Sequence, residues 1–399
     1  MKPEFYRKVL DNGMTILFEK RDLPVVSVAI GVRQGGINES GSEKGISHFI
    51  EHMLYKGTPT RDAKRIAEEI EKNGGELNGF TSNSITAYHC KIPSKKLGVA
   101  LNVLSDMVKN PLFDSKELEK ERKVIFEEIK MYHDNPTLHV FEQIHKCLYE
   151  KPFGVPLIGT YDSMNSINRE KMLEKFKEVY HPNNMILIVV GDADFEMIVK
   201  FAEENFPKTR GKLFLQDIKK KNESKIEKRK GIDQANLIFA YHVPLAGDKK
   251  SYAAEILITL MAGGLSSRLF NEIREKRNLA YAIKGESNIH NIFAYNLIYV
   301  GTTKENVEVV KKIILEEFEK VSKELGEEEL KQVKEQVIGN YQISMEDSQL
   351  QMSNLLLHET NGNAQKFYDF EKNISGVKLE DVKNLAKIKN YSFFALVPD

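Results

Sequence analysis

Apolar and polar positions in the first half of the chain follow two periods, one typical of strands and the other of helices. Residues 25–32, 85–92 and 186–190 are largely apolar, β-branched runs of strand length. Elsewhere the apolar residues recur at helical spacing and are bounded by capping residues. This pattern predicts helices over 43–56 with Ser42 as N-cap, over 62–73, over 95–109, and from Asp114, as the cap, to about Tyr132.

The second half of the chain repeats the order of the first. Thr86-Ala87-Tyr88-His89 returns as Phe293-Ala294-Tyr295-Asn296, and Glu117-Leu118 returns as Glu329-Leu330. The two offsets, 207 and 212 residues, differ by a small insertion. Two such matches in the same order, half a chain apart, predict two related domains.

The segment 208–230 is the best candidate for a linker, because it has no sustained apolar period and contains the basic run Lys219–Lys221. A basic run of this kind is typical of a solvated surface segment rather than a nucleic-acid patch. We therefore predict a first domain over 1–210, a linker over 211–232 and a second domain over 233–399.

Composition narrows the class of protein. The 399 residues carry 58 basic and 58 acidic side chains, and this balance argues against a nucleic-acid partner. Cys90 and Cys147 are too few for a disulfide framework, which favours a reducing compartment. The first residues lack the apolar core of a signal peptide, and no apolar run is long enough for a bilayer. We expect a cytoplasmic protein with no membrane segment.

The sequence His48-Phe49-Ile50-Glu51-His52 carries the sharpest chemical signal. Positions four apart share a face of a helix, so the imidazoles of His48 and His52 can reach one ion. Glu51 lies beside that face without being needed as a ligand. Zinc makes bound water much more acidic, and a nearby carboxylate can then act as general base. We predict that Glu51 has this role.

A third ligand should come from another element, and the helix after Asp114 supplies Glu121 and Glu128. These two glutamates are seven residues apart and share a face. At the offset of 212 they correspond to Val333 and Asn340, so the second domain lacks both carboxylates.

His-x-x-Glu-His is the inverted zinc motif. Together with Glu121-Arg122 and with Glu128, which stands 76 residues after His52, it resembles the pitrilysin and mitochondrial processing peptidase family, in its short two-domain bacterial or archaeal type. The resemblance covers nearly the whole chain. It implies an α+β fold with two homologous domains, each a mostly antiparallel sheet packed with helices, that together form half of a clamshell. It implies zinc held by His48, His52 and Glu128, with Glu121 among the catalytic residues beside the site.

The same resemblance implies residues that contact substrate. Asn78, Gly79, Phe80 and Thr81 look like the family's edge strand, to which a peptide adds as an extra strand. Without the resemblance, Asn78-Gly79 would be taken for a turn. In the second half, the stretch 263–270 and the residues from Arg274 to Tyr281 also look like this family. There the matching Arg and Tyr lie near the scissile carbonyl, where they can stabilise an oxyanion.

Assembly follows from the resemblance too. The family's full chamber has four repeats, whereas this chain has two. We therefore expect a homodimer in which Arg274 and Tyr281 of one copy face the zinc of the other, or a heterodimer with a related subunit. An enclosed chamber implies that short or unfolded peptides are the substrates.

Three functions remain open from the sequence. The first is a zinc metalloendopeptidase. The second is an iron enzyme, because two His and one carboxylate also form a facial triad; Glu51 argues against it, since an oxygenase needs no base for peptide hydrolysis. The third is a non-catalytic subunit that binds peptides or assembles a complex.

Overall fold

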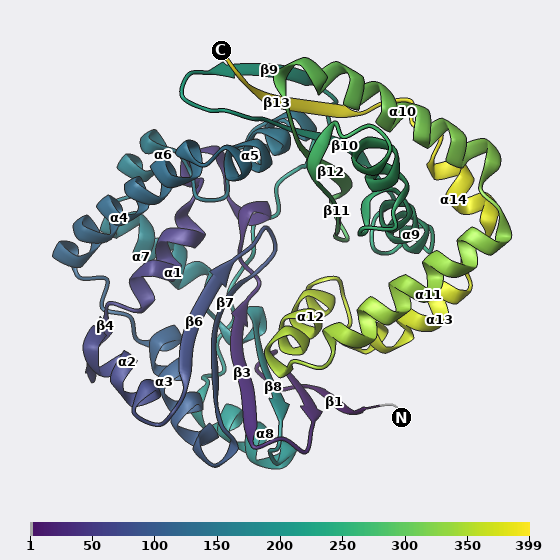
Figure 1. The fold of residues 1–399 in the computed structure, drawn as a ribbon. Helices are drawn as coiled ribbons and strands as arrows, with labels where there is room; N and C mark the ends of the chain where they lie inside the picture. Colours follow the sequence, from purple (N-terminus) through teal and green to yellow (C-terminus); the bar gives the residue numbers. More distant parts are fainter. Residues whose placement is uncertain (1–2) are drawn as a thin grey trace. The chain divides into compact units, whose positions relative to one another are not determined.

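The computed structural model describes residues 3–399, and the chain forms two compact units. Unit 1 comprises the chain up to Ile129, Val155–Asp217 and Ser344–Tyr368. Unit 2 comprises Lys130–Gly154, Ile218–Ile343 and Asp369–Asp399. Each unit combines one main sheet with several helices (Figure 1), so the predicted α+β class with two repeated parts is confirmed.

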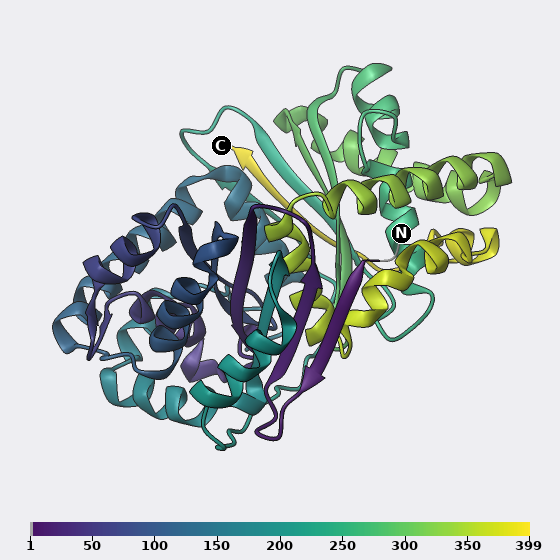
Figure 2. The same ribbon diagram turned by 90° about the horizontal axis from the view of Figure 1, so that it is seen from below.

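The sheet of unit 1 has the strand order β1-β2-β8-β3-β7-β6 and is antiparallel except where β2 meets β8. Figure 2 shows β1 at one edge of this sheet, and β6 forms the other edge. The strands are β1 (Glu4–Val9), β2 (Thr15–Lys20), β3 (Val25–Val32), β6 (Glu76–Thr81), β7 (Thr86–Pro93) and β8 (Met185–Gly191). A separate short pair joins β4 (Gly57–Thr58) to β5 (Arg61–Asp62).

Helices cover both faces of this sheet, which is why β3 and β8 read as continuous apolar runs. Helix α3 packs against β3 and β7, and α12 packs against β3 and β8 on the other side (Figure 1). The helices of unit 1 are α1 (Ile46–Leu54), α2 (Ala63–Glu71), α3 (Leu97–Lys109), α4 (Ser115–Asp134, ending in unit 2), α6 (Tyr161–Ser166), α7 (Arg169–Val179), α8 (Phe195–Asn205) and α12 (Ser348–Thr360).

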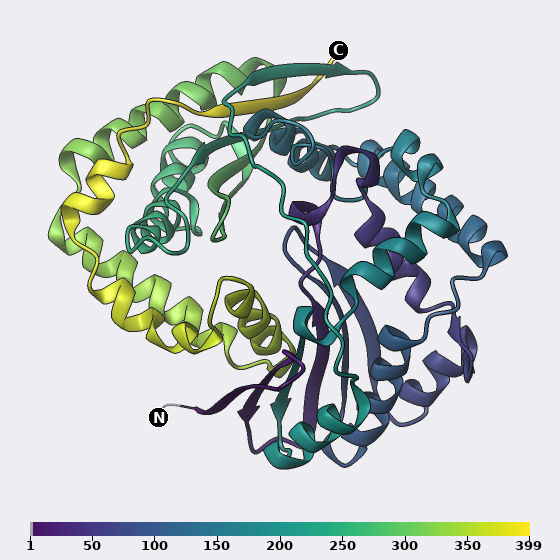
Figure 3. The same ribbon diagram turned by 180° about the vertical axis from the view of Figure 1, so that it is seen from behind.

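The sheet of unit 2 repeats this topology without a counterpart of β1. Its order β9-β13-β10-β12-β11 matches β2-β8-β3-β7-β6, and the first pair is again the parallel one. Strands β9 and β13, far apart in the sequence, run side by side in Figure 3. The strands are β9 (Ser224–Arg229), β10 (Ala235–His242), β11 (Ala280–Ile289), β12 (Ala294–Thr302) and β13 (Ser392–Pro398).

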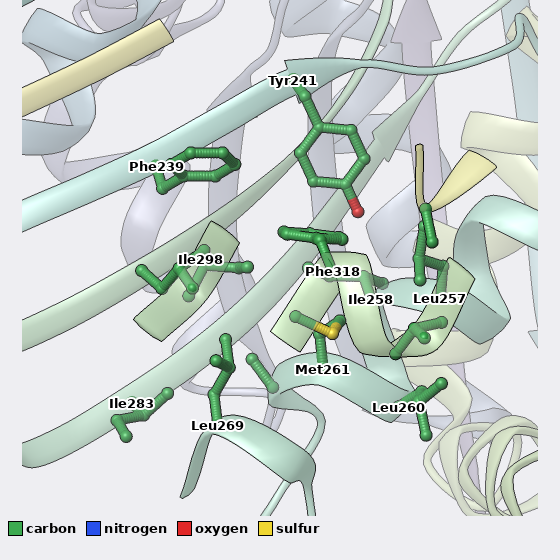
Figure 4. Close-up of a cluster of buried hydrophobic side chains, with 14 of the residues drawn as sticks. Phe239, Tyr241, Leu257, Ile258, Leu260, Met261, Leu269, Ile283, Ile298 and Phe318 are labelled. Atoms are coloured by element: carbon green, nitrogen blue, oxygen red, sulfur yellow. The ribbon is translucent and has the colours of Figure 1, made fainter. Parts of the chain in front are cut away.

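The core of unit 2 lies between its strands and helices α9 and α10. Figure 4 shows Leu257, Ile258 and Met261 of α9 gathered with Ile298 of β12 and Phe318 of α10. The helices of this unit are α5 (Pro136–Leu148), α9 (Ser251–Ala262), α10 (Val307–Glu324), α11 (Glu327–Ser344, whose last residue belongs to unit 1), α13 (Phe370–Ser375) and α14 (Leu379–Leu385), with a π-helical turn at Phe270–Glu275.

Two equivalent helices are exchanged between the two halves of the chain. Helix α5 packs against β10 and β13 of unit 2, whereas α12 packs against β3 and β8 of unit 1. Their N-caps, Asn135 and Asp347, are 212 residues apart, and each side chain accepts hydrogen bonds from the second and third backbone N–H groups that follow. The predicted domains 1–210 and 233–399 follow the order of the chain and do not contain this exchange. As limits of homologous domains they stay a prediction.

One local prediction, the start of the first helix, was wrong. The first helix begins at Ile46 rather than at 43, and a 3₁₀ turn over Gly41–Glu43 precedes it, so Ser42 is not its N-cap. The predicted linker 211–232 contains β9, whose side chains are mostly exposed and which is held by backbone pairing to β13. In the part of the chain that the structure describes, no helix has the length and apolar character needed to cross a membrane.

Candidate metal centre and active site

Helix α1 starts at a glycine with a left-handed backbone. Gly45 has φ of +88°, and a Cβ there would lie 2.4 Å from Met164 Cε and 2.7 Å from the carbonyl oxygen of Ile158. The buried carboxylate of Glu39 accepts hydrogen bonds from the backbone N–H groups of Gly45 (3.1 Å) and Ser47 (2.9 Å). A negative charge at this end favours the helix. These contacts fix the position and direction of α1.

His48 and His52 present the same ring nitrogen to one carboxylate. The Nε2 atom of each lies 3.6 Å from Oε2 of Glu128, which projects from α4. One ligand atom from each of the three residues lies within 4.8 Å of the other two. The structure therefore brings together the three residues predicted as metal ligands.

The other ring nitrogen of His52 contacts Glu121. Its Nδ1 lies 3.1 Å from Glu121 Oε2, and Glu121 Oε1 lies 2.7 Å from Lys56 Nζ. Metal-binding histidines usually donate their second N–H to a carboxylate, which fixes the tautomer and the ring orientation. Glu121, predicted among the catalytic residues, thus contacts the candidate ligand His52 and not the position that a metal ion would occupy.

Arg122 fixes α4, and with it Glu128, beside α1. Its guanidinium donates to the carbonyl oxygens of Met164 and Ile167 and pairs with Glu119. The guanidinium carbon also lies 5.4 Å from the ring centroid of Phe49 on α1.

The protonation states of these side chains favour the binding of a cation. Burial, followed by the neighbouring His52, lowers the pKa of His48 to about 3, so His48 is a neutral imidazole with a free lone pair at pH 7. Burial raises the pKa of Glu128, because nothing nearby offsets its charge fully. Two imidazoles and one carboxylate are the protein donors of many catalytic zinc sites, which keep a further position open. The residues present therefore fit a zinc ion.

Glu51 lies on the same helix, and among the residues that the structure describes only one of its oxygens has a hydrogen-bond partner. Thr81 Oγ1 donates to Glu51 Oε2 at 2.6 Å. Burial raises the pKa of Glu51, which moves this carboxylate toward the range of a general base at neutral pH. Its Oε1 lies 3.2 Å from the place that a Cβ on Gly79 would occupy.

The predicted substrate strand coincides with β6, the edge of the sheet in unit 1. Asn78 is exposed, while Gly79 and Phe80 are half-buried. The side chain of Thr81 points to Glu51, as its hydrogen bond shows. An edge strand of this kind can accept an added strand through its backbone.

Arg274 and Tyr281 lie together in unit 2. Arg274 Nη1 donates to the Tyr281 carbonyl oxygen at 3.3 Å, and the guanidinium carbon is 5.0 Å from the Tyr281 ring centroid. Tyr281 is 77% exposed, so its ring and hydroxyl are open to a ligand.

Two residues near the candidate metal centre were not predicted. Lys56 follows His52 by four residues, and Tyr55 follows Glu51 by four. Helical spacing from the motif would have placed both on the same face as the motif residues. The predicted helix over 43–56 contains both positions, so the signal was available.

The fold and the His-His-Glu set define a class of protein, the two-domain metallopeptidases with an inverted zinc motif. Residues 15–161 match the family model described as "Insulinase (Peptidase family M16)", and residues 166–337 match "Peptidase M16 inactive domain". An "uncharacterized zinc protease" of Rickettsia felis is 34% identical over 87% of this chain and 85% of its own. The "uncharacterized zinc protease YmxG" of Bacillus subtilis is 32% identical over 96% of this chain and 94% of its own. The chain belongs to peptidase family M16.

Solved structures agree on the fold. A protease from Helicobacter pylori superposes with a TM-score of 0.92 at 22% identity, covering 99% of this chain and 100% of its own. An M16-like peptidase from Alicyclobacillus acidocaldarius gives a TM-score of 0.88 at 19% identity, covering 100% and 99%. The family models and the relatives, rather than these structures, confirm at the level of the family the resemblance inferred from the sequence.

Proposed function

We propose that this protein is a zinc-dependent endopeptidase that hydrolyses short or unfolded peptides. The observation that carries the proposal is the approach of His48 Nε2 and His52 Nε2 to the same oxygen of Glu128, each at 3.6 Å. In this proposal these three residues hold the ion, and Glu121 and Lys56 orient His52.

Zinc held by His48, His52 and Glu128 would supply Lewis-acid chemistry, which would polarise the scissile carbonyl and make water more acidic. Glu51 Oε1 accepts the proton from the attacking water and returns it to the leaving amine. Thr81 leaves Oε1 available for this, because its hydroxyl occupies Oε2. The raised pKa of Glu51 supports both proton transfers.

The substrate backbone pairs with β6 at residues 78–81 in this proposal. The exposed edge and the closeness of Gly79 to Glu51 support it, because a peptide along this edge would bring a carbonyl group near the base. Arg274 and Tyr281 act on the oxyanion or position the peptide, an assignment that rests on their likeness to the family and on their mutual contact.

We extend the proposal to the oligomeric state and the cellular location of the protein. Two units per chain, against four in the family's full chamber, support a homodimer in which Arg274 and Tyr281 serve the metal site of the partner copy. A heterodimer with a related subunit is the alternative. The two cysteines are both free and buried, which supports a cytoplasmic location. A monomer by light scattering that is fully active would contradict the dimer and leave the chemistry untouched.

Cleavage of a quenched-fluorescent peptide, combined with metal analysis, tests the function. The parent protein should contain one zinc per chain and cleave the peptide, while Glu51→Gln should keep the zinc and lose cleavage by a factor of at least about 10³. Glu127→Gln is a matched control, because Glu127 is an exposed neighbour of Glu128 on α4. It should change neither quantity.

The alternatives make different predictions in the same experiment. An iron enzyme would purify with iron in place of zinc. A non-catalytic subunit would bind peptide without cleaving it, and Glu51→Gln would then have no effect. Equal cleavage rates of the parent and Glu51→Gln would exclude the proposed mechanism.

A further inference from the structure

Tyr55 extends the chemical face of α1 by one more turn. His48, Glu51, His52 and Tyr55 are spaced three, four and seven residues from the first, so their side chains share one side of the helix. Tyr55 is the C-cap of α1 and keeps helical backbone angles. Its ring therefore lies on the face that presents the candidate metal ligands and the candidate base.

The hydroxyl of Tyr55 is buried and has no hydrogen-bond partner among the described residues. Two neighbouring tyrosines differ from it: the hydroxyls of Tyr88 and Tyr180 bond to each other at 2.9 Å. The Tyr55 and Tyr88 rings lie 6.1 Å apart, so all three belong to one aromatic cluster. A buried hydroxyl without a partner destabilises the fold, and phenylalanine would fill the same ring space without that cost. Stability alone therefore gives no reason for a tyrosine at this position.

Gly79 of β6 brings this hydroxyl close to Glu51. A Cβ on Gly79 would lie 2.4 Å from the Tyr55 hydroxyl oxygen and 3.2 Å from Glu51 Oε1. Both oxygens thus approach the same point on β6, from the same helix. Thr81, two residues along β6, holds the opposite oxygen of Glu51.

We propose that Tyr55 is a positioning residue for the general base. Its hydroxyl donates a hydrogen bond to Glu51 Oε1 in the working site, opposite the bond that Thr81 donates to Oε2. Two donors on opposite oxygens fix the plane of the carboxylate while leaving a lone pair of Oε1 for the proton of the attacking water. Gly79 is needed in this arrangement, because any side chain there would occupy the space of the hydroxyl. The inference rests on the proposed function, since it assigns a partner to the base of that reaction.

Tyr55→Phe in the zinc-loaded, full-length protein tests the proposal. Because the substitution removes a hydrogen bond to a charged group, kcat should fall roughly 10-fold or more. KM and zinc content should stay unchanged, and the melting temperature should stay the same or rise. The matched control is Tyr180→Phe, which breaks the buried Tyr88–Tyr180 bond in the same cluster. It should lower the melting temperature and change kcat by no more than about twofold.

Tyr55→Phe in a Glu51→Asp variant distinguishes an effect of Tyr55 that acts through Glu51 from a general loss of activity. Glu51→Asp withdraws the carboxylate by one methylene, so Tyr55→Phe should cause no further loss of kcat in that background. An unchanged kcat for Tyr55→Phe in an active parent would overturn the inference. An equal loss in the Glu51→Asp background would do so as well.

If the proposed function itself is wrong, the experiment gives a different result, because the parent protein would then cleave no peptide. In that case the melting temperature still tests Tyr55. A lower value for Tyr55→Phe than for the parent would show that the hydroxyl serves the fold, and would overturn the inference.

Discussion

Thr81 on the edge strand β6 donates a hydrogen bond of 2.6 Å to Glu51 on α1. From the sequence, Thr81 was predicted only as part of a candidate substrate strand. The structure adds that its side chain contacts the candidate base. One strand thus presents its backbone at the sheet edge and a hydroxyl to the carboxylate of the candidate base.

Thr81→Val should lower kcat roughly 10-fold with little change in KM, because the valine is isosteric and removes only the hydrogen bond to Glu51. Thr81→Ser should keep most of the activity. Steady-state peptide cleavage measures both. A rise in KM without a change in kcat would assign Thr81 to substrate binding instead.

Glu121→Gln should weaken zinc binding by about 10- to 100-fold, the usual effect of removing a carboxylate that supports a metal-binding histidine. The reason is its contact with His52 Nδ1 at 3.1 Å. Competition with a chromogenic chelator measures the affinity. Glu127→Gln on the same helix is the control, and equal affinities for the two variants would refute the role of Glu121.

Gly45→Ala should destabilise the protein by about 2 kcal/mol or more, because a left-handed backbone and a crowded site both disfavour a side chain. Gly98→Ala is the matched control: Gly98 lies in α3 with nothing within 4 Å of an added Cβ. It should stabilise by about 0.5–1 kcal/mol. Urea unfolding followed by circular dichroism distinguishes the two, and an equal effect at both positions would contradict this account of α1.

Asp106 anchors the turn that follows α1. Although burial opposes it, hydrogen bonds from Asn110, Thr58, Arg61 and Thr60 lower the pKa of Asp106 to about 2. A carboxyl whose folded pKa lies below its unfolded value stabilises the protein above the unfolded pKa, and this contribution is lost as pH falls.

Asp106→Asn should therefore lower the melting temperature at pH 7. It should also flatten the decline in stability between about pH 4 and pH 2, the window between the unfolded and folded pKa values. Thermal unfolding at a series of pH values measures this. A parallel decline in parent and variant across that window would contradict the role of Asp106.

The sequence predicted the features that depend on residues close to one another in the chain. His48 and His52 share a helical turn, so their common face followed from spacing alone. Buried strands such as β3, whose bounds agree with the prediction, are continuous apolar runs because both faces of the sheet are covered. Glu128 could be chosen among several glutamates only through the resemblance to the family.

Other features depend on contacts between distant parts of the chain. The exchange of α5 and α12 leaves no local pattern, because an amphipathic helix does not indicate which sheet it will cover. Strand β9 was missed because its side chains are mostly exposed and backbone pairing holds it. The start of α1 depends on Glu39, six residues before Gly45, and a capping carboxylate at that distance has no sequence signature.

The proposed function depends on the binding of one zinc ion by His48, His52 and Glu128. A crystal structure of the zinc-loaded protein, with anomalous data at the zinc edge, tests it most directly. We expect one strong peak about 2.0–2.2 Å from Nε2 of both histidines and from a carboxylate oxygen of Glu128. A zinc peak bound elsewhere, in protein that contains one zinc per chain, would contradict it.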